Sequence, residues 1–209
     1  MANNKIYVLG DSISIHYGPY LKIFLEGILD YSRKEGEEEA LLNLDNPQGA
    51  NGGDSSTVLN FLIEKIRSGG IQADILLVNC GLHDIRTNPT TGIKQIAKDQ
   101  YEKNLHSIII ASKKLQTKMV WISTTPCDET IHNVLEPSFH RYSTDCVEYN
   151  EVAKNIMSTA GIPIVDLFAF TSNLGSELYC DHVHFTDSVR QKQAAFIAGW
   201  LQCFLLYQE

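Results

Sequence analysis

Hydrophobic positions along the chain form short unbroken runs, and these alternate with longer stretches in which apolar and polar residues are mixed. The short runs are rich in β-branched and aromatic residues, which favours strands, and the mixed stretches have helical spacing. The predicted strands cover residues 6–9, 75–79, 119–123 and 164–167, with a weaker candidate at 41–44. The predicted helices cover residues 20–31, 55–68, 93–115, 142–159 and 188–207.

Strands that are apolar throughout are typical of a parallel sheet covered by helices on both faces. The alternation of strands and helices therefore predicts an α/β fold with three layers and a doubly wound sheet. Residues 1–209 are expected to form a single domain, because no linker or repeat divides them. Residues 32–53 and 125–141 are predicted to be irregular, and the run EGEEE at 35–39 is interpreted as a solvated loop.

Polar motifs follow the predicted strands at the points where the strands end. These motifs are GDS at 10–12, NGGDSS at 51–56, GLHD at 81–84, STTP at 123–126 and DHVHFTD at 181–187. Ligands of open parallel sheets bind at the carboxyl ends of the strands, so chemistry is expected at this edge. Each motif alone is weak evidence, because Gly, Asp and Ser are ordinary turn and helix-cap residues.

Taken together, the motifs supply the parts of a nucleophilic acyl-transfer site. A serine hydroxyl needs a base, the base needs a carboxylate that holds its tautomer, and the oxyanion needs hydrogen-bond donors. Ser12 is the candidate nucleophile, His184 the base and Asp181 the orienting acid, with backbone N–H groups of Ser12 and Gly53 as donors. Asp181 and His184 are three positions apart, so one tight turn can place both side chains on the same side of a loop.

The motifs in this order resemble the blocks of the SGNH hydrolases, also called the GDSL lipase and esterase superfamily, over about residues 5–205. The resemblance implies a flavodoxin-like α/β/α fold with a central parallel sheet of five strands. It also implies Ser12 as nucleophile, Asp181 and His184 as its partners, and Gly53 as an oxyanion donor. The third block departs from the pattern, since His83 stands where the family usually has asparagine.

The role of His83 is open at this point. One ring N–H of a neutral imidazole can replace the amide donor, and an imidazolium would donate more strongly and would make activity sensitive to pH near neutrality. Alternatively His83 packs under the site, and Asn79 or a backbone N–H donates instead. Asp11 and Asp84 are interpreted as loop braces, and His182 as a poorer base than its neighbour His184.

Composition limits the partners. The net charge of −8 at pH 7 disfavours nucleic acid and anionic membrane surfaces. The five cysteines have no regular spacing, and MANNKIYVLG does not resemble a secretion signal, so a cytoplasmic protein without cofactor or metal is expected.

The expected partner is a small-molecule ester, and the resemblance favours acetyl esters, with those of carbohydrates among them. Thr124, Thr125 and Pro126, with residues 132–142, are expected to line the substrate pocket. A lysophospholipase or thioesterase of the same fold is the alternative activity. Two other classes compete: a metal site made of Asp181, His182, His184 and His83, or a flavodoxin-like binding module that has lost its activity.

Overall fold

A computed structural model describes residues 4–206. Its centre is one sheet of five parallel strands in the order β2-β1-β3-β4-β5. The strands are β1 (Asn4–Leu9), β2 (Leu29–Arg33), β3 (Ile75–Val78), β4 (Lys118–Ile122) and β5 (Ile164–Val165). The predicted α/β class and the doubly wound parallel sheet are confirmed.

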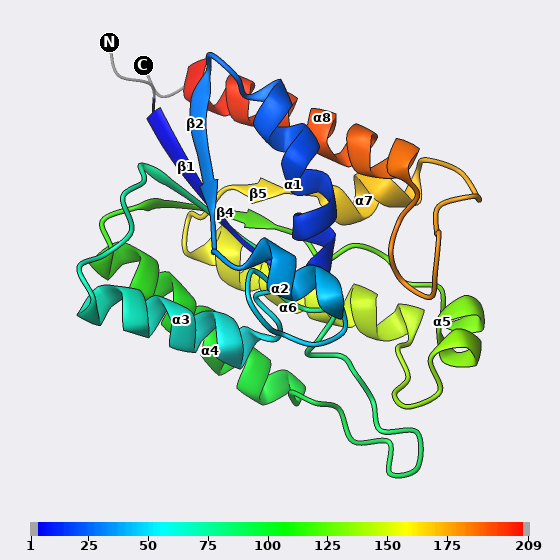
Figure 1. Cartoon of the computed structure of the whole chain (residues 1–209). Helices are drawn as coiled ribbons and strands as arrows, with labels where there is room; N and C mark the ends of the chain where they lie inside the picture. Colours follow the sequence, from blue (N-terminus) through cyan, green and yellow to red (C-terminus); the bar gives the residue numbers. More distant parts are fainter. Residues whose placement is uncertain (1–3, 207–209) are drawn as a thin grey trace.

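Helices cover both faces of the sheet (Figure 1). One layer holds α1 (Ser12–Phe24), α7 (Leu167–Ser172) and α8 (Asp187–Leu206), and the other holds α3 (Ser55–Arg67), α4 (Lys98–Lys114) and α6 (Ser143–Thr159). Two short helices, α2 (Glu37–Leu42) and α5 (Glu129–Leu135), lie in the loops that follow β2 and β4. Within residues 4–206, no helix is long and apolar enough to span a bilayer.

The central strands are apolar on both faces because both faces are covered. All four residues of β3 are buried, and Ile6 of β1 and Val120 of β4 are fully inaccessible to solvent. On the last helix, Trp200, Phe204 and Leu205 are partly buried and pack against this core. The sheet is therefore a rigid support for the loops at its carboxyl edge.

The prediction was wrong for the second strand. Residues 41–44 were expected to be a strand, but Leu41 and Leu42 end helix α2, which also takes up part of the EGEEE run. The strand is instead Leu29–Arg33, which lies at the sheet edge with alternating buried and exposed residues. An edge strand covered on one face lacks the unbroken apolar run by which the central strands are recognised.

Helix boundaries differ from the prediction in two places. The first helix begins at Ser12 rather than at residue 20 and ends at Phe24, and it contains Pro19. The helix expected at 93–115 begins at Lys98, so residues 93–97 are part of a loop. The last residue of the expected final helix, 207, lies outside the described residues.

Candidate active site

Ser12 is placed by the turn that joins β1 to α1. Asp11 caps the helix, and its side chain accepts a hydrogen bond from the N–H of Ile13 at 3.0 Å. The NGGDSS loop is held against this turn, because Gly52 donates its N–H to the carbonyl of Gly10 at 2.9 Å. A side chain at position 52 would meet that carbonyl oxygen at 2.9 Å, so the close approach requires glycine. The first two motifs thus share one small region.

The last loop completes a hydrogen-bonded chain with Ser12. Nε2 of His184 lies 2.9 Å from Oγ of Ser12, and Nδ1 of His184 lies 2.8 Å from Oδ2 of Asp181. An ionised carboxylate only accepts, so Nδ1 carries the proton and Nε2 accepts from the serine hydroxyl. The three side chains that the sequence nominated as catalytic are therefore adjacent, in the order a nucleophile, base and orienting acid require.

The loop around Asp181 holds its carboxylate in the charged form. Burial alone would raise the pKa of Asp181, but hydrogen bonds from the His184 ring and from the backbone N–H groups of Val183 and His184 outweigh it, so the pKa is lowered. Ser12 is 4% exposed and His184 2% exposed. The reactive pair is sealed from bulk water, while the carboxylate behind it remains accessible.

The candidate oxyanion donors are not all free to donate. Ser12 is the first residue of α1, where backbone N–H groups have no partner within the helix. Gly53 has a left-handed φ of 65°, and its N–H donates to Oδ1 of Asn51 at 3.0 Å. Gly53 can donate to an oxyanion only by sharing or releasing that hydrogen bond. Its assignment as a donor stays a prediction.

His83 is buried as a neutral ring. Burial, with the charges of Arg86 and Arg141 nearby, lowers its pKa well below the ordinary value of 6.5. Its Nδ1 is sealed and has no hydrogen-bond partner. A bare ring nitrogen is less costly there than an unpaired N–H, so we infer that the proton resides on Nε2. The cationic donor considered from sequence is disfavoured, and a neutral donor stays possible.

Asn79, the other candidate donor, is occupied within the sheet. Its side-chain amide donates to the carbonyl of Ile122 at 3.0 Å. Asp84 accepts the N–H of Ser55 with both carboxylate oxygens, at 3.0 and 3.1 Å, and so anchors the start of α3. Burial raises the pKa of Asp84 to about 8 despite that bond, so the side chain is largely protonated at neutral pH. Asp84 and Asp11 both act as braces, as expected.

The STTP segment is tied to its neighbours. Thr124 donates its hydroxyl to the carbonyl of Cys80 at 2.9 Å and its N–H to Asn150 at 2.8 Å. Thr125 is buried, with a hydroxyl that has no partner, and Pro126 is half-buried. The assignment of these three residues to substrate binding stays a prediction.

His182 has partners of its own. Its Nε2 lies 3.0 Å from Oδ2 of Asp45, and its Nδ1 lies 2.9 Å from Nδ1 of His132. Asp181, His182 and His184 are close enough for one atom of each to reach a common metal ion. A metal there would have to displace these hydrogen bonds as well as the one between His184 and Ser12. The donor set therefore fits a hydrogen-bonded site better than a metal centre.

Sequence reasoning missed His16 and Asp45 near the site, and it included His132 and Arg141 only within the range 132–142 expected to line the pocket. His16 lies one turn after Ser12, and its ring meets that of His184 edge-on with centroids 5.0 Å apart. His132, Asp45 and Arg141 come from the two segments expected to be irregular. The i, i+4 spacing of Ser12 and His16 is the one signal that could have revealed such a residue.

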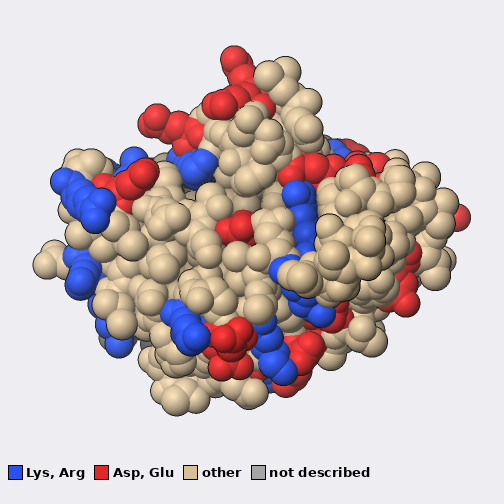
Figure 2. All heavy atoms as spheres, turned by 90° about the horizontal axis from the view of Figure 1, so that it is seen from below, with Lys and Arg blue, Asp and Glu red and all other residues tan. Residues whose placement is uncertain are grey.

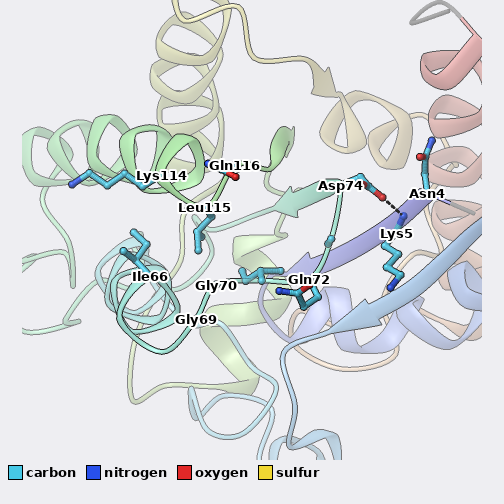
Figure 3. Close-up of a pocket in the computed structure, with 12 residues that line it drawn as sticks. Asn4, Lys5, Ile66, Gly69, Gly70, Gln72, Asp74, Lys114, Leu115 and Gln116 are labelled. Atoms are coloured by element: carbon cyan, nitrogen blue, oxygen red, sulfur yellow. Dashed lines mark hydrogen bonds between the residues drawn. The ribbon is translucent and has the colours of Figure 1, made fainter. Parts of the chain in front are cut away.

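A separate cavity lies away from these residues. A space of about 700 Å³ opens at the amino edge of the sheet, lined by Lys5, Gln72 and Asp74 among others (Figure 3). Asp74 accepts the backbone N–H of Lys5 there at 2.7 Å. Charged side chains of both signs are interspersed on the face shown in Figure 2, without a broad basic area on that face.

Comparison with known proteins gives matches in structure only. No family model matches the chain, and no curated protein matches it in sequence. Among solved structures, the acetyl xylan esterase AlAXEase is 15% identical with a TM-score of 0.67, covering 93% of this chain and 98% of that one. A lipase/acylhydrolase from Enterococcus faecalis is 16% identical with a TM-score of 0.65, covering 95% of each chain.

A third match is a catalytic mutant of the acetylxylan esterase Axe2 from Geobacillus stearothermophilus, 15% identical with a TM-score of 0.67 and 94% of each chain covered. Another is described as a lipolytic protein of the G-D-S-L family from Veillonella parvula. The chain has the fold of these hydrolases. The resemblance stated from the sequence is thereby confirmed at the level of the fold.

Proposed function

We propose that the chain is a serine esterase that hydrolyses esters of small acyl groups, acetyl foremost. The observation that carries the proposal is the continuous hydrogen-bonded chain from Ser12 through His184 to Asp181, at 2.9 and 2.8 Å. The tight surroundings of Ser12 favour a small acyl group. The acetylxylan esterases among the structural matches agree with an acetyl ester and suggest a carbohydrate alcohol.

The proposed mechanism has two steps. Oγ of Ser12 attacks the ester carbonyl while Nε2 of His184 takes the hydroxyl proton, and His184 then gives that proton to the leaving alcohol oxygen. A water molecule attacks the acyl-serine, again losing its proton to His184, and the acid leaves as Ser12 recovers its proton. Asp181 stabilises the imidazolium that forms in both steps.

Donors for the tetrahedral oxyanion are proposed to be the N–H of Ser12, the N–H of Gly53 and Nε2–H of His83. The N–H of Gly53 becomes available when its bond to Asn51 lengthens or is shared. Donors of this kind act on charge that exists only in the transition state, so they raise kcat rather than affinity.

The test is hydrolysis of p-nitrophenyl acetate in the presence of EDTA by the wild type and by Ser12→Ala. We expect Ser12→Ala to lower kcat by at least about a thousandfold, and the wild type to be unaffected by EDTA. Ser107→Ala changes a serine on α4 whose hydroxyl bonds only within its own helix, so it is the matched control and should keep full activity.

Three outcomes would contradict the proposal. Unchanged hydrolysis in Ser12→Ala would exclude the serine mechanism, and loss of wild-type activity in EDTA would favour a metal. Failure of the wild type to hydrolyse acetyl, longer acyl or thioester substrates, together with no labelling of Ser12 by a fluorophosphonate, would favour a binding module.

A further inference from the structure

Three arginines have buried or nearly buried side chains, and only one of them has no carboxylate partner. Arg33 lies 3.8 Å from Glu37, and Arg86 lies 3.3 Å from Asp45. Arg141 is 1% exposed, yet within the described residues no carboxylate oxygen lies within 4.0 Å of it. Asp45 and Asp11 act on this charge only from beyond that distance, so the buried guanidinium has no carboxylate in direct contact.

Arg141 lies beside the proposed catalytic centre. Its Nε donates to the carbonyl of Leu82 at 2.7 Å, directly before His83. Its Nη1 lies 3.5 Å from Nδ1 of His132, and the ring of His132 is 4.9 Å from that of His182. The His182 ring is in turn 5.7 Å from the ring of the proposed base, His184.

The hydrogen bonds around Arg141 leave its terminal nitrogen Nη1 without an acceptor. Burial, with the charge of Arg141 nearby, lowers the pKa of His132 to about 3, so its ring is neutral. The simplest assignment has Nε2–H of His182 donating to Asp45 and Nδ1–H of His132 donating to Nδ1 of His182. Nδ1 of His132 then presents a hydrogen to Arg141 and cannot accept from it.

The second terminal nitrogen is also free. Nη2 of Arg141 has no hydrogen-bond partner among residues 4–206 and is not one of the sealed side-chain atoms. Asp45 uses its carboxylate oxygens on His182 and Arg86. With this assignment, neither terminal nitrogen of Arg141 has an acceptor within residues 4–206.

We propose that Arg141 is the anion-binding group of the substrate site, and that the natural substrate is an ester that also carries a carboxylate. This inference rests on the proposed esterase function. The planar guanidinium fork matches a carboxylate with two parallel hydrogen bonds. The net charge of −8 does not oppose this locally, because screening limits its reach to about 8 Å at physiological ionic strength.

The test compares neutral and anionic esters that are otherwise matched. One pair is methyl 3-acetoxybenzoate and 3-acetoxybenzoate, which carries the charge on the alcohol side. The other is methyl 4-nitrophenyl succinate and mono-4-nitrophenyl succinate, which carries it on the acyl side. We expect the wild type to prefer the anionic member of one pair by about tenfold or more in kcat/KM, and the responsive pair identifies the side.

Arg141→Gln should reduce that preference to about onefold, because kcat/KM falls more for the anionic ester than for its neutral partner. Arg141→Lys keeps the charge but not the fork, so it should keep part of the preference. Arg67→Gln is the matched control, because it makes the same substitution at an exposed position at the end of α3 and should leave the preference intact.

One measurement uses the wild type alone, so its result does not depend on whether the Arg141 variants fold. Benzoate should inhibit hydrolysis of p-nitrophenyl acetate competitively, and benzamide should not. Absence of any preference, an unchanged preference in Arg141→Gln, or an equal loss on both members of a pair would overturn the anion site. If the wild type hydrolyses no ester in either pair, the esterase proposal itself fails.

Discussion

The two edges of the sheet use their loops in opposite ways. At the amino edge, loops around Lys5 and Gln72 leave an open space of about 700 Å³. At the carboxyl edge, Ser12 and His184 are almost inaccessible, and every nitrogen of the DHVH histidines has a partner within 3.0 Å. The open space therefore lies away from the proposed catalytic residues. Those residues are held by fixed contacts, which would lower the reorganisation that the proposed reaction requires.

The largest predicted effect concerns the DHVH loop, whose two histidines have different partners. His184→Gln should lower kcat for p-nitrophenyl acetate by about ten-thousandfold, because the base is lost. His182→Gln should lower it less than about tenfold, because His182 contacts Asp45 and His132 rather than Ser12. Steady-state kinetics on both variants, with circular dichroism to verify folding, provides the measurement. A larger effect at His182 would reverse the roles given to the two histidines.

His83 is the next most informative position. His83→Leu should lower kcat by about a hundredfold to a thousandfold, whereas His83→Asn should stay within about tenfold, because asparagine also presents an N–H. The low pKa of His83 keeps the ring neutral through the neutral range, so the pH profile of His83→Asn between pH 6 and 8 should parallel that of the wild type. Full activity in His83→Leu would mean that the imidazole only fills space.

Asp84 makes a prediction about stability rather than rate. In the folded state the pKa of Asp84 is about 8, above the ordinary value of 3.8. The contribution of the protonated Asp84 carboxyl to folding stability is therefore present in full below pH 3.8 and is lost as the pH rises through 8. Relative to the wild type, Asp84→Asn should gain stability with rising pH across this window, by at most about 1.4 kcal/mol per pH unit. Urea unfolding of both proteins at several pH values measures this difference, and a constant difference would mean that Asp84 is ionised when buried.

The smallest predicted effects are changes in stability, and they have opposite signs at the two edges of the sheet. Gly53, at the carboxyl edge, has φ of 65°, and an added Cβ would lie 2.6 Å from Cβ of Pro47. Gly53→Ala should cost about 1–2 kcal/mol of stability and also lower kcat. Gln116, at the amino edge, has φ of 58° just after α4, where glycine is the favoured residue. Gln116→Gly should add about 0.5–1 kcal/mol and leave kcat unchanged.

Thermal and denaturant unfolding, with esterase assays on the same samples, distinguish these two variants. A gain of stability in Gly53→Ala would show that its backbone relaxes without cost. Loss of activity in Gln116→Gly would show that the amino edge affects the site.

The strands and site residues that could be predicted are those with a local sequence pattern. Unbroken apolar runs predict β1, β3 and β4, and the three-residue spacing of Asp181 and His184 predicts their pairing. The edge strand β2 was missed because half of its residues face solvent.

The surroundings of the triad were not predictable for a different reason. Asp45 meets His182 across 137 residues of sequence, and Arg141 meets Leu82 across 59. Both arise from segments without regular periodicity, so only tertiary structure brings them to the site. The neutral state of His83 likewise depends on burial and on two arginine charges that no local pattern contains.

The hydrogen bond between His184 and Ser12 joins residues 172 positions apart. Contacts of such separation form late, because they require the intervening sheet and its crossovers to be in place. Esterase activity should therefore return after most of the secondary structure when the denatured chain refolds. On a ribosome, the serine would stay inert until the DHVH loop had emerged and docked, so that synthesis itself delays the appearance of a reactive nucleophile.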